Sequence, residues 1–141
     1  MWPDYLDNPQ AIRSAFPNGV PELKGLRPGR LLIDFAGIVF LGLDAQPLPD
    51  GSPARWQEKG NDGLEYRFMF YDTSDMSIAG TPQHLGPSVA LTLDKGVARL
   101  FSRDGGFRTA FKFRGARIAL RPFSERRRDD LGDFWPPSSS R

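Results

Sequence analysis

The chain has 141 residues, a formal net charge of +2, 39% hydrophobic residues and no cysteine. This length suffices for one domain with its own core, and the lack of cysteine excludes disulfides and thiolate metal sites. No stretch approaches the roughly 18 apolar residues of a membrane-spanning helix, and the N-terminus has no basic and apolar leader pattern. We therefore expect a cytoplasmic protein with no membrane partner.

The N-terminal residues predict one short helix. Asn8 is able to accept a backbone N–H at a helix start, and Pro9 suits the first helical position. Ile12 and Phe16 are four residues apart and share a face, and Pro17 ends the helix. A helix of about two turns is stable only when it docks on another element, so we expect it to lie on a sheet.

Two apolar runs, 30–35 and 38–43, flank an Ala36-Gly37 turn. Their nearly continuous apolar character predicts a central hairpin that is buried on both faces. Residues 44–63 follow as a long polar connection, which is too rich in proline to predict a helix.

The next run, 64–71, alternates well and predicts a strand whose inward-facing residues are Leu64, Tyr66, Phe68 and Phe70. The chain then turns at 72–75 and is expected to return beside this strand. In that pairing Phe70 lies opposite Met76 and Phe68 opposite Ile78.

Residues 89–121 predict a meander of four strands with two-residue turns at Lys95-Gly96, Asp104-Gly105 and Gly115-Ala116. The predicted opposed pairs are Leu91 with Leu100, Leu100 with Thr109, Phe111 with Leu120, and Phe113 with Ile118. Because directly opposed residues share a face, one face of the meander is apolar and the other is basic.

The predicted fold is mainly β, an antiparallel meander, strongly bent sheet or sandwich of about eight strands with one short N-terminal helix. Residues 1–123 are expected to form this single domain. The charged and Pro/Ser-rich residues 124–141 have no periodicity and are expected to form a flexible tail.

The sequence offers no catalytic motif. No nucleophile elbow, zinc-protease, Walker or dinucleotide pattern occurs, and His84 is the only histidine. The pair Asp72 and Asp75 lacks the glycine and distal glutamate of a calcium loop. We therefore expect no enzymatic activity, no metal site and no cofactor.

Charge is unevenly distributed along the chain. Residues 34–94 contain three basic and nine acidic residues, whereas 95–121 contain eight basic and one acidic residue. The basic face of the meander is a candidate surface for an anionic partner such as nucleic acid: Arg99, Arg108, Lys112, Arg114, Arg117 and Arg121. Only one aromatic residue, Phe101, shares this face, which weakens the nucleic-acid reading.

The order of features resembles the immunity protein 50 family of bacterial polymorphic toxin systems over residues 1–123. The features are Met1-Trp2, Asn8-Pro9 at a short helix, a first hairpin, a proline-rich loop reaching Trp56, the strand 64–71, and Phe111-Lys112-Phe113 before Ile118. The resemblance implies a non-enzymatic cytoplasmic protein that binds and neutralises a cognate toxin domain.

The family resemblance assigns no contact residues, so the candidate toxin-binding surface comes from the acidic part of this sequence. It comprises Asp44, Asp50, Trp56, Glu58, Asp62 and Glu65. The carboxylates suit a basic partner, and the tryptophan is typical either of an interface anchor or of a buried plug at the end of the sheet. Two other functions stay open. A nucleic-acid-binding domain would use the basic face, and a small-molecule carrier would need a pocket between the sheets.

Overall fold

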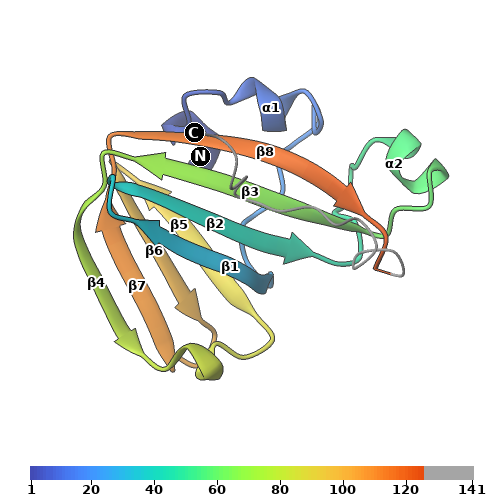
Figure 1. The fold of residues 1–141 in the computed structure, drawn as a ribbon. Coiled ribbons are helices and arrows are strands. Elements are labelled where there is room, and N and C mark those ends of the chain that lie inside the picture. The colour runs from blue at the N-terminus through green and yellow to red at the C-terminus, as the bar shows by residue number, and fades with distance from the viewer. Residues whose placement is uncertain (126–141) are drawn as a thin grey trace.

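The computed structural model describes residues 1–125, and this part of the chain is mainly β, as predicted (Figure 1). In chain order its elements are the 3₁₀ turn η1 (Trp2–Tyr5), α1 (Gln10–Arg13), β1 (Arg27–Asp34), β2 (Ile38–Ala45), α2 (Ala54–Glu58), β3 (Gly63–Tyr71), β4 (Ser74–Gly80), the 3₁₀ turn η2 (Pro82–His84), β5 (Val89–Asp94), β6 (Val97–Ser102), β7 (Phe107–Lys112) and β8 (Gly115–Phe123). Most of the predicted tail, residues 126–141, lies outside the described residues.

The strands form two antiparallel four-stranded sheets. The first has the order β1-β2-β3-β8 and the second the order β4-β7-β6-β5. Figure 1 shows the two sheets diverging from one corner, where β3 passes into β4 and β7 passes into β8. The chain therefore changes sheet twice at the same place.

These two crossings make one continuous ribbon of two long antiparallel segments, 63–80 and 107–123. Tyr71 pairs with Gly115 at the end of the first sheet, and Ser74 pairs with Lys112 at the start of the second. The N–H of Arg114 donates to the carbonyl of Tyr71 at 3.1 Å and joins the two crossings. The ribbon bends at this corner, so both sheets share it.

Two of the predicted strand pairings, and the residue pairs that depend on them, are wrong for this reason. The strand 115–123 leaves the meander and pairs with β3, which puts Ile118 opposite Phe68 and Leu120 opposite Tyr66 rather than beside the meander's phenylalanines. Likewise, β4 does not return beside β3 but pairs with β7, where Ile78 lies opposite Thr109. A pattern of alternating burial shows which side of a strand faces the core, but it does not show which strand lies beside it.

The first two hairpins of the meander have the predicted registers. Leu91 lies opposite Leu100, and Leu100 lies opposite Thr109. Lys95 has the positive φ, 50°, that a two-residue turn of this type requires. The turn at 103–106 differs from the prediction, because Asp104 does not adopt a positive φ and its carboxylate instead accepts the N–H of Gly106 at 2.9 Å.

The hairpin of β1 and β2 is not central. Its turn has three residues, since Asp34 pairs with Ile38, and Gly37 supplies the positive φ of 84°. β2 is an inner strand and well buried, but β1 is a sheet edge on which Leu32 and Ile33 are exposed. The apolar run of β1 therefore does not reflect burial on both faces.

The core lies between the inner faces of the two sheets. The rings of Phe111 and Phe113, on the second sheet and the link that follows it, contact Phe70 of β3 with ring centroids 5.0 and 5.1 Å apart. Trp2 packs edge-on against Phe68 at 5.9 Å. The predicted inward residues of β3 are all buried: Leu64, Tyr66, Phe68 and Phe70.

The N-terminal segment closes one side of the sandwich. Asn8 does not cap the helix, because its side chain donates to the carbonyl of Ile118 at 2.8 Å and accepts its N–H at 2.9 Å. Leu26 exchanges two backbone hydrogen bonds with Val89 of β5, at 3.1 and 2.7 Å. The segment thereby covers the edge of β8 in one sheet and the edge of β5 in the other.

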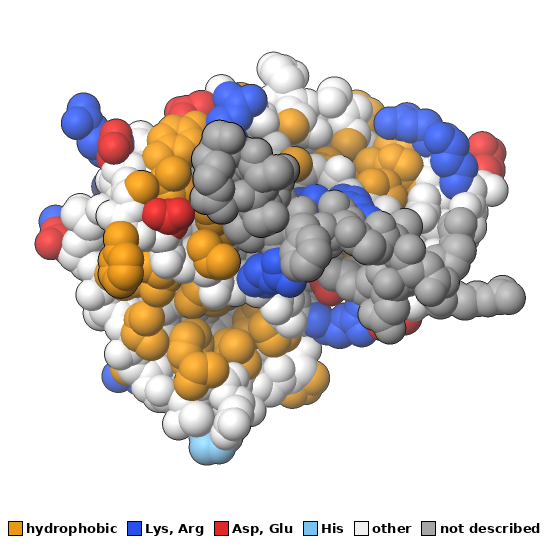
Figure 2. All heavy atoms as spheres, viewed as in Figure 1, with side chains coloured by type: hydrophobic (Ala, Val, Ile, Leu, Met, Phe, Trp, Pro, Cys, Tyr) orange, Lys and Arg blue, Asp and Glu red, His pale blue; other side chains and the backbone are white. Residues whose placement is uncertain are grey.

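The opposite side carries the other two edge strands, β1 and β4. Ile33 and Ile78 are exposed on these strands, and Phe35 is fully exposed in the turn after β1. Figure 2, which has the view of Figure 1, shows hydrophobic side chains gathered over the area of β1, β4 and β7.

Candidate partner-binding surfaces

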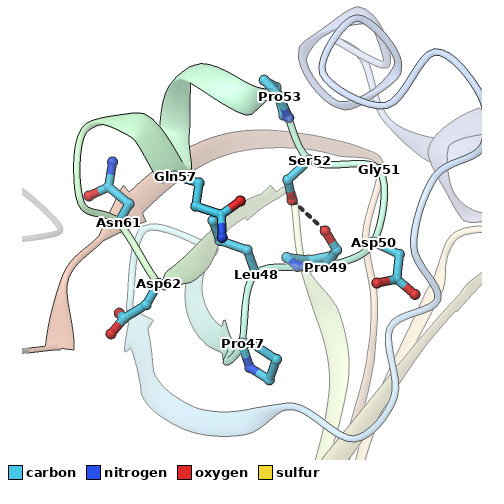
Figure 3. A pocket seen from close by; sticks show the side chains of 10 residues that line it. All are labelled: Pro47, Leu48, Pro49, Asp50, Gly51, Ser52, Pro53, Gln57, Asn61 and Asp62. Carbon is cyan, nitrogen blue, oxygen red and sulfur yellow. Dashed lines mark hydrogen bonds between the residues drawn. The ribbon is translucent and has the colours of Figure 1, made fainter.

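The long connection between β2 and β3 folds into a concave site with a volume of about 450 Å³ (Figure 3). Its walls come from the proline-rich segment and from the residues around α2: Pro47, Leu48, Pro49, Asp50, Gly51, Ser52, Pro53, Gln57, Asn61 and Asp62. The Ser52 hydroxyl donates to the carbonyl of Pro49 at 2.6 Å and holds the turn whose Gly51 has a φ of 84°. The segment is therefore an ordered surface rather than an extended linker.

The helix α2 in this connection was not predicted, because the prolines around it argued against any helix. They lie before it rather than within it, and Pro53 is compatible with a helix start. Trp56 is the buried residue of α2 and packs edge-on against Phe16 with ring centroids 5.9 Å apart. Its exposed fraction of 8% makes it a plug between the loop and the N-terminal segment rather than an exposed anchor.

Asp62 ends the connection and is held in place by the end of β8. Its N–H donates to the carbonyl of Phe123 at 3.0 Å, and its carboxylate accepts the N–H of Glu125 at 3.0 Å. Asp50 is exposed on the other side of the site, and Figure 3 shows the two carboxylates at opposite ends of it. Glu58 is exposed on α2.

The remaining two predicted acidic residues do not belong to this site. Asp44 and Glu65 lie opposite each other on β2 and β3, on the outer face of the first sheet, and both are buried. Glu65 forms an ion pair with Arg67 at 2.8 Å and lies 4.0 Å from Arg121. The predicted acidic surface is therefore divided between the loop and a charged cluster on the sheet.

The predicted basic face is also divided. Its first three residues, Arg99, Arg108 and Lys112, lie on the outer face of the second sheet, because they alternate with the buried residues along β6 and β7. Arg117 and Arg121 lie on the outer face of the first sheet. Arg114 lies in the link between the two sheets, so one partner does not meet all six on a single sheet face.

A hollow of about 360 Å³ lies on the outer face of the second sheet. Its lining combines two arginines and an exposed phenylalanine with small residues: Ser77, Ala79, Arg99, Leu100, Phe101, Arg108, Thr109 and Ala110. Sequence reasoning missed this hollow, because Ser77 and Ala79 reach it only through the pairing of β4 with β7. The available signal was the alternation of small residues with Met76 and Ile78 along that strand.

A smaller apolar cleft of about 230 Å³ lies on the open side between the sheets. Among its lining residues are Leu31 and Leu43 of the first sheet and Leu100 and Phe107 of the second. The volume is below the roughly 300 to 1,000 Å³ typical of small-molecule pockets. The core beyond it is filled by the packed rings of Phe70, Phe111 and Phe113.

Within residues 1–125 no group of three or more side chains is arranged to hold a metal ion. His84 is exposed at the end of η2. No helix in this part of the chain is long and apolar enough to cross a membrane. Comparison of the chain with protein-family models, with curated proteins and with solved structures finds no match.

Proposed function

We propose that the chain is a non-enzymatic immunity protein that binds and neutralises a cognate toxin domain, as its resemblance to the immunity protein 50 family implies. The observation that supports this proposal best is the concave site of the β2–β3 connection, which carries exposed carboxylates on a loop that hydrogen bonds hold in place. A surface that is ordered before binding loses less conformational entropy when the partner arrives.

The proposed contact surface consists of Asp50, Glu58 and Asp62. Their charges are exposed, so they are able to attract a basic partner and speed its association. Trp56 is left out because it is buried against Phe16, and Asp44 and Glu65 are left out because they are buried on the first sheet.

The test is co-expression with the candidate toxin domain encoded beside this chain, followed by measurement of cell survival and co-purification. We expect survival and a stoichiometric complex with the native chain. The variant Asp50→Lys/Glu58→Lys reverses two charges of the proposed contact surface, one lining the concave site and one on α2, so we expect weaker protection and a lower affinity for the toxin domain.

The matched control is Glu22→Lys/Asp34→Lys, which reverses two exposed charges outside the β2–β3 connection and the proposed contact surface. It should protect as well as the native chain. Absence of both rescue and complex with the native chain would contradict the immunity function. Full protection by the site variant would contradict only the proposed surface.

A further inference from the structure

The hollow on the outer face of the second sheet places an aromatic ring beside two arginines. Phe101 of β6 lies directly opposite Arg108 of β7, and Arg99 lies two residues before Phe101 on the same face. Ala79 is opposite Arg108 on its other side, and Ala110 is opposite Arg99. The small side chains leave the space above the sheet open between the larger ones.

The two arginines carry charge that no described residue neutralises. Neither Arg99 nor Arg108 forms an ion pair or a side-chain hydrogen bond within residues 1–125. Both are exposed.

The neighbouring carboxylates have other partners. Asp75 forms an ion pair with Lys112 at 3.0 Å, and Asp94 accepts the hydroxyl of Tyr5 at 3.2 Å. Asp104 accepts the N–H of Gly106 and the hydroxyl of Ser102, and these hydrogen bonds lower its pKa. The hollow is therefore a locally cationic surface.

Phe101 decides which anion suits this surface. Its exposed fraction is 38%, whereas the other aromatic residues in the strands of this sheet, Phe107 and Phe111, are buried on the inner face. An acidic protein segment would be satisfied by the arginines and would gain little from an exposed ring. A nucleotide in a single strand has both a phosphate for the arginines and an unpaired base that stacks on an aromatic side chain.

We propose that this hollow binds single-stranded nucleic acid, with a base stacked on Phe101 and the neighbouring phosphates held by Arg99 and Arg108. The volume of about 360 Å³ falls in the range of small-ligand sites, which suits one nucleotide seated in the hollow. This activity is separate from the proposed immunity function and does not depend on it.

The test measures fluorescence anisotropy of a labelled oligothymidine of about 10 nucleotides, titrated with the full chain at several salt concentrations. We expect binding that weakens with salt. Arg99→Gln/Arg108→Gln should lower the affinity and reduce the slope of log affinity against log salt by roughly 1.4, because each phosphate contact on a single strand contributes about 0.7.

Phe101→Leu keeps an apolar side chain and removes the ring, so we expect at least about a fivefold loss of affinity from lost stacking. The control Lys24→Gln/Arg55→Gln removes the same charge from exposed positions outside the hollow and outside the predicted basic face, and it should bind like the native chain.

Three outcomes would overturn the proposal: no binding by the native chain, equal losses in the hollow and control variants, or unchanged binding by Phe101→Leu. Displacement of the oligonucleotide by polyglutamate at equal charge concentration would also overturn it, since the surface would then recognise any polyanion.

Discussion

The hydroxyl of Tyr66 lies in the core of the sandwich without a hydrogen-bond partner among the described residues. Its ring stacks on Phe68 with centroids 6.5 Å apart, so the side chain contributes through packing. Burial raises the pKa of the Tyr66 hydroxyl well above its usual range. The oxygen therefore carries a desolvation cost that nothing within residues 1–125 offsets.

Tyr66→Phe keeps the ring and removes this oxygen, so we expect the free energy of unfolding at neutral pH to rise by about 1 kcal/mol. The unfolded tyrosine loses its proton near pH 10 whereas the buried one keeps it, so native stability falls as the pH rises past about 10. The variant should lack this part of the fall. Urea unfolding at neutral and alkaline pH measures both effects.

Tyr71→Phe is the matched control. Its hydroxyl donates to the carboxylate of Asp7 at 2.7 Å, so its removal should not stabilise the chain. A Tyr66→Phe variant less stable than the native chain would show that the hydroxyl has a partner in solution.

At the scale of elements, the protected sheet edges depend on a few side-chain contacts. Asn8 satisfies both the N–H and the carbonyl of Ile118 on the outer edge of β8, as a neighbouring strand would. The residue looks like a helix cap in the sequence, and its amide does accept a backbone N–H. The donor, however, lies 110 positions away, and no local pattern indicates such a partner.

Asn8→Ala removes both hydrogen bonds and leaves two edge groups without them, so we expect a loss of about 1 to 3 kcal/mol in unfolding free energy. The amide of Ile118 should also exchange its hydrogen faster. Asn18→Ala, at an exposed position, should change stability by less than about 0.5 kcal/mol. Unchanged exchange at Ile118 in Asn8→Ala would contradict this role.

The registers of local hairpins were predictable, because the turn and the alternating burial pattern of the two strands it joins are compatible with only one register. Leu91, Leu100 and Thr109 lie where the pattern placed them. The crossings after Tyr71 and Phe113 were not predictable in the same way. On either side of each crossing, the apolar residues face one shared core, so their pattern is the same whether the chain turns back or changes sheet.

The candidate surfaces were only partly predictable for the same reason. Asp50 and Asp62 belong to one continuous segment, and the structure brings both to the concave site. Asp44 and Glu65 lie opposite each other instead, because β2 and β3 pair there, and Glu65 forms an ion pair with Arg67 of the same sheet. Which residues share a surface built from several strands depends on which strands pair, and the composition of the sequence does not reveal that pairing.

At the scale of the whole molecule, neither sheet is complete without the shared ribbon. The ring of Phe111 in one sheet contacts Phe70 in the other, and the ribbon joins both sheets at the corner. Loss of either sheet would therefore expose the core face of the other. We infer that residues 1–123 unfold as one cooperative unit.

Phe111→Ala removes a ring from this shared core, so we expect a loss of about 3 to 5 kcal/mol while the unfolding transition stays single. Near-ultraviolet and far-ultraviolet circular dichroism should give coincident urea transitions. Phe35→Ala, at a fully exposed ring, should change stability by less than about 0.5 kcal/mol. Separate transitions for the two signals would show that the sheets unfold independently.

The bulge in β4 sets the pairing register of the rest of that strand against β7. Between Ser74 and Ser77 the register against β7 shifts, so that Ile78 lies opposite the buried Thr109 on the inner face, where it is exposed at the sheet edge, and Ala79 lies opposite Arg108 on the outer face. If the regular pairing of Ser74 with Lys112 continued along β4 without this shift, Ile78 would lie opposite Arg108, and a branched side chain would stand where the hollow now has an alanine methyl group. The register shift within one edge strand thus determines whether the outer face is open or filled, although the amino-acid composition of the strand would be the same in both registers.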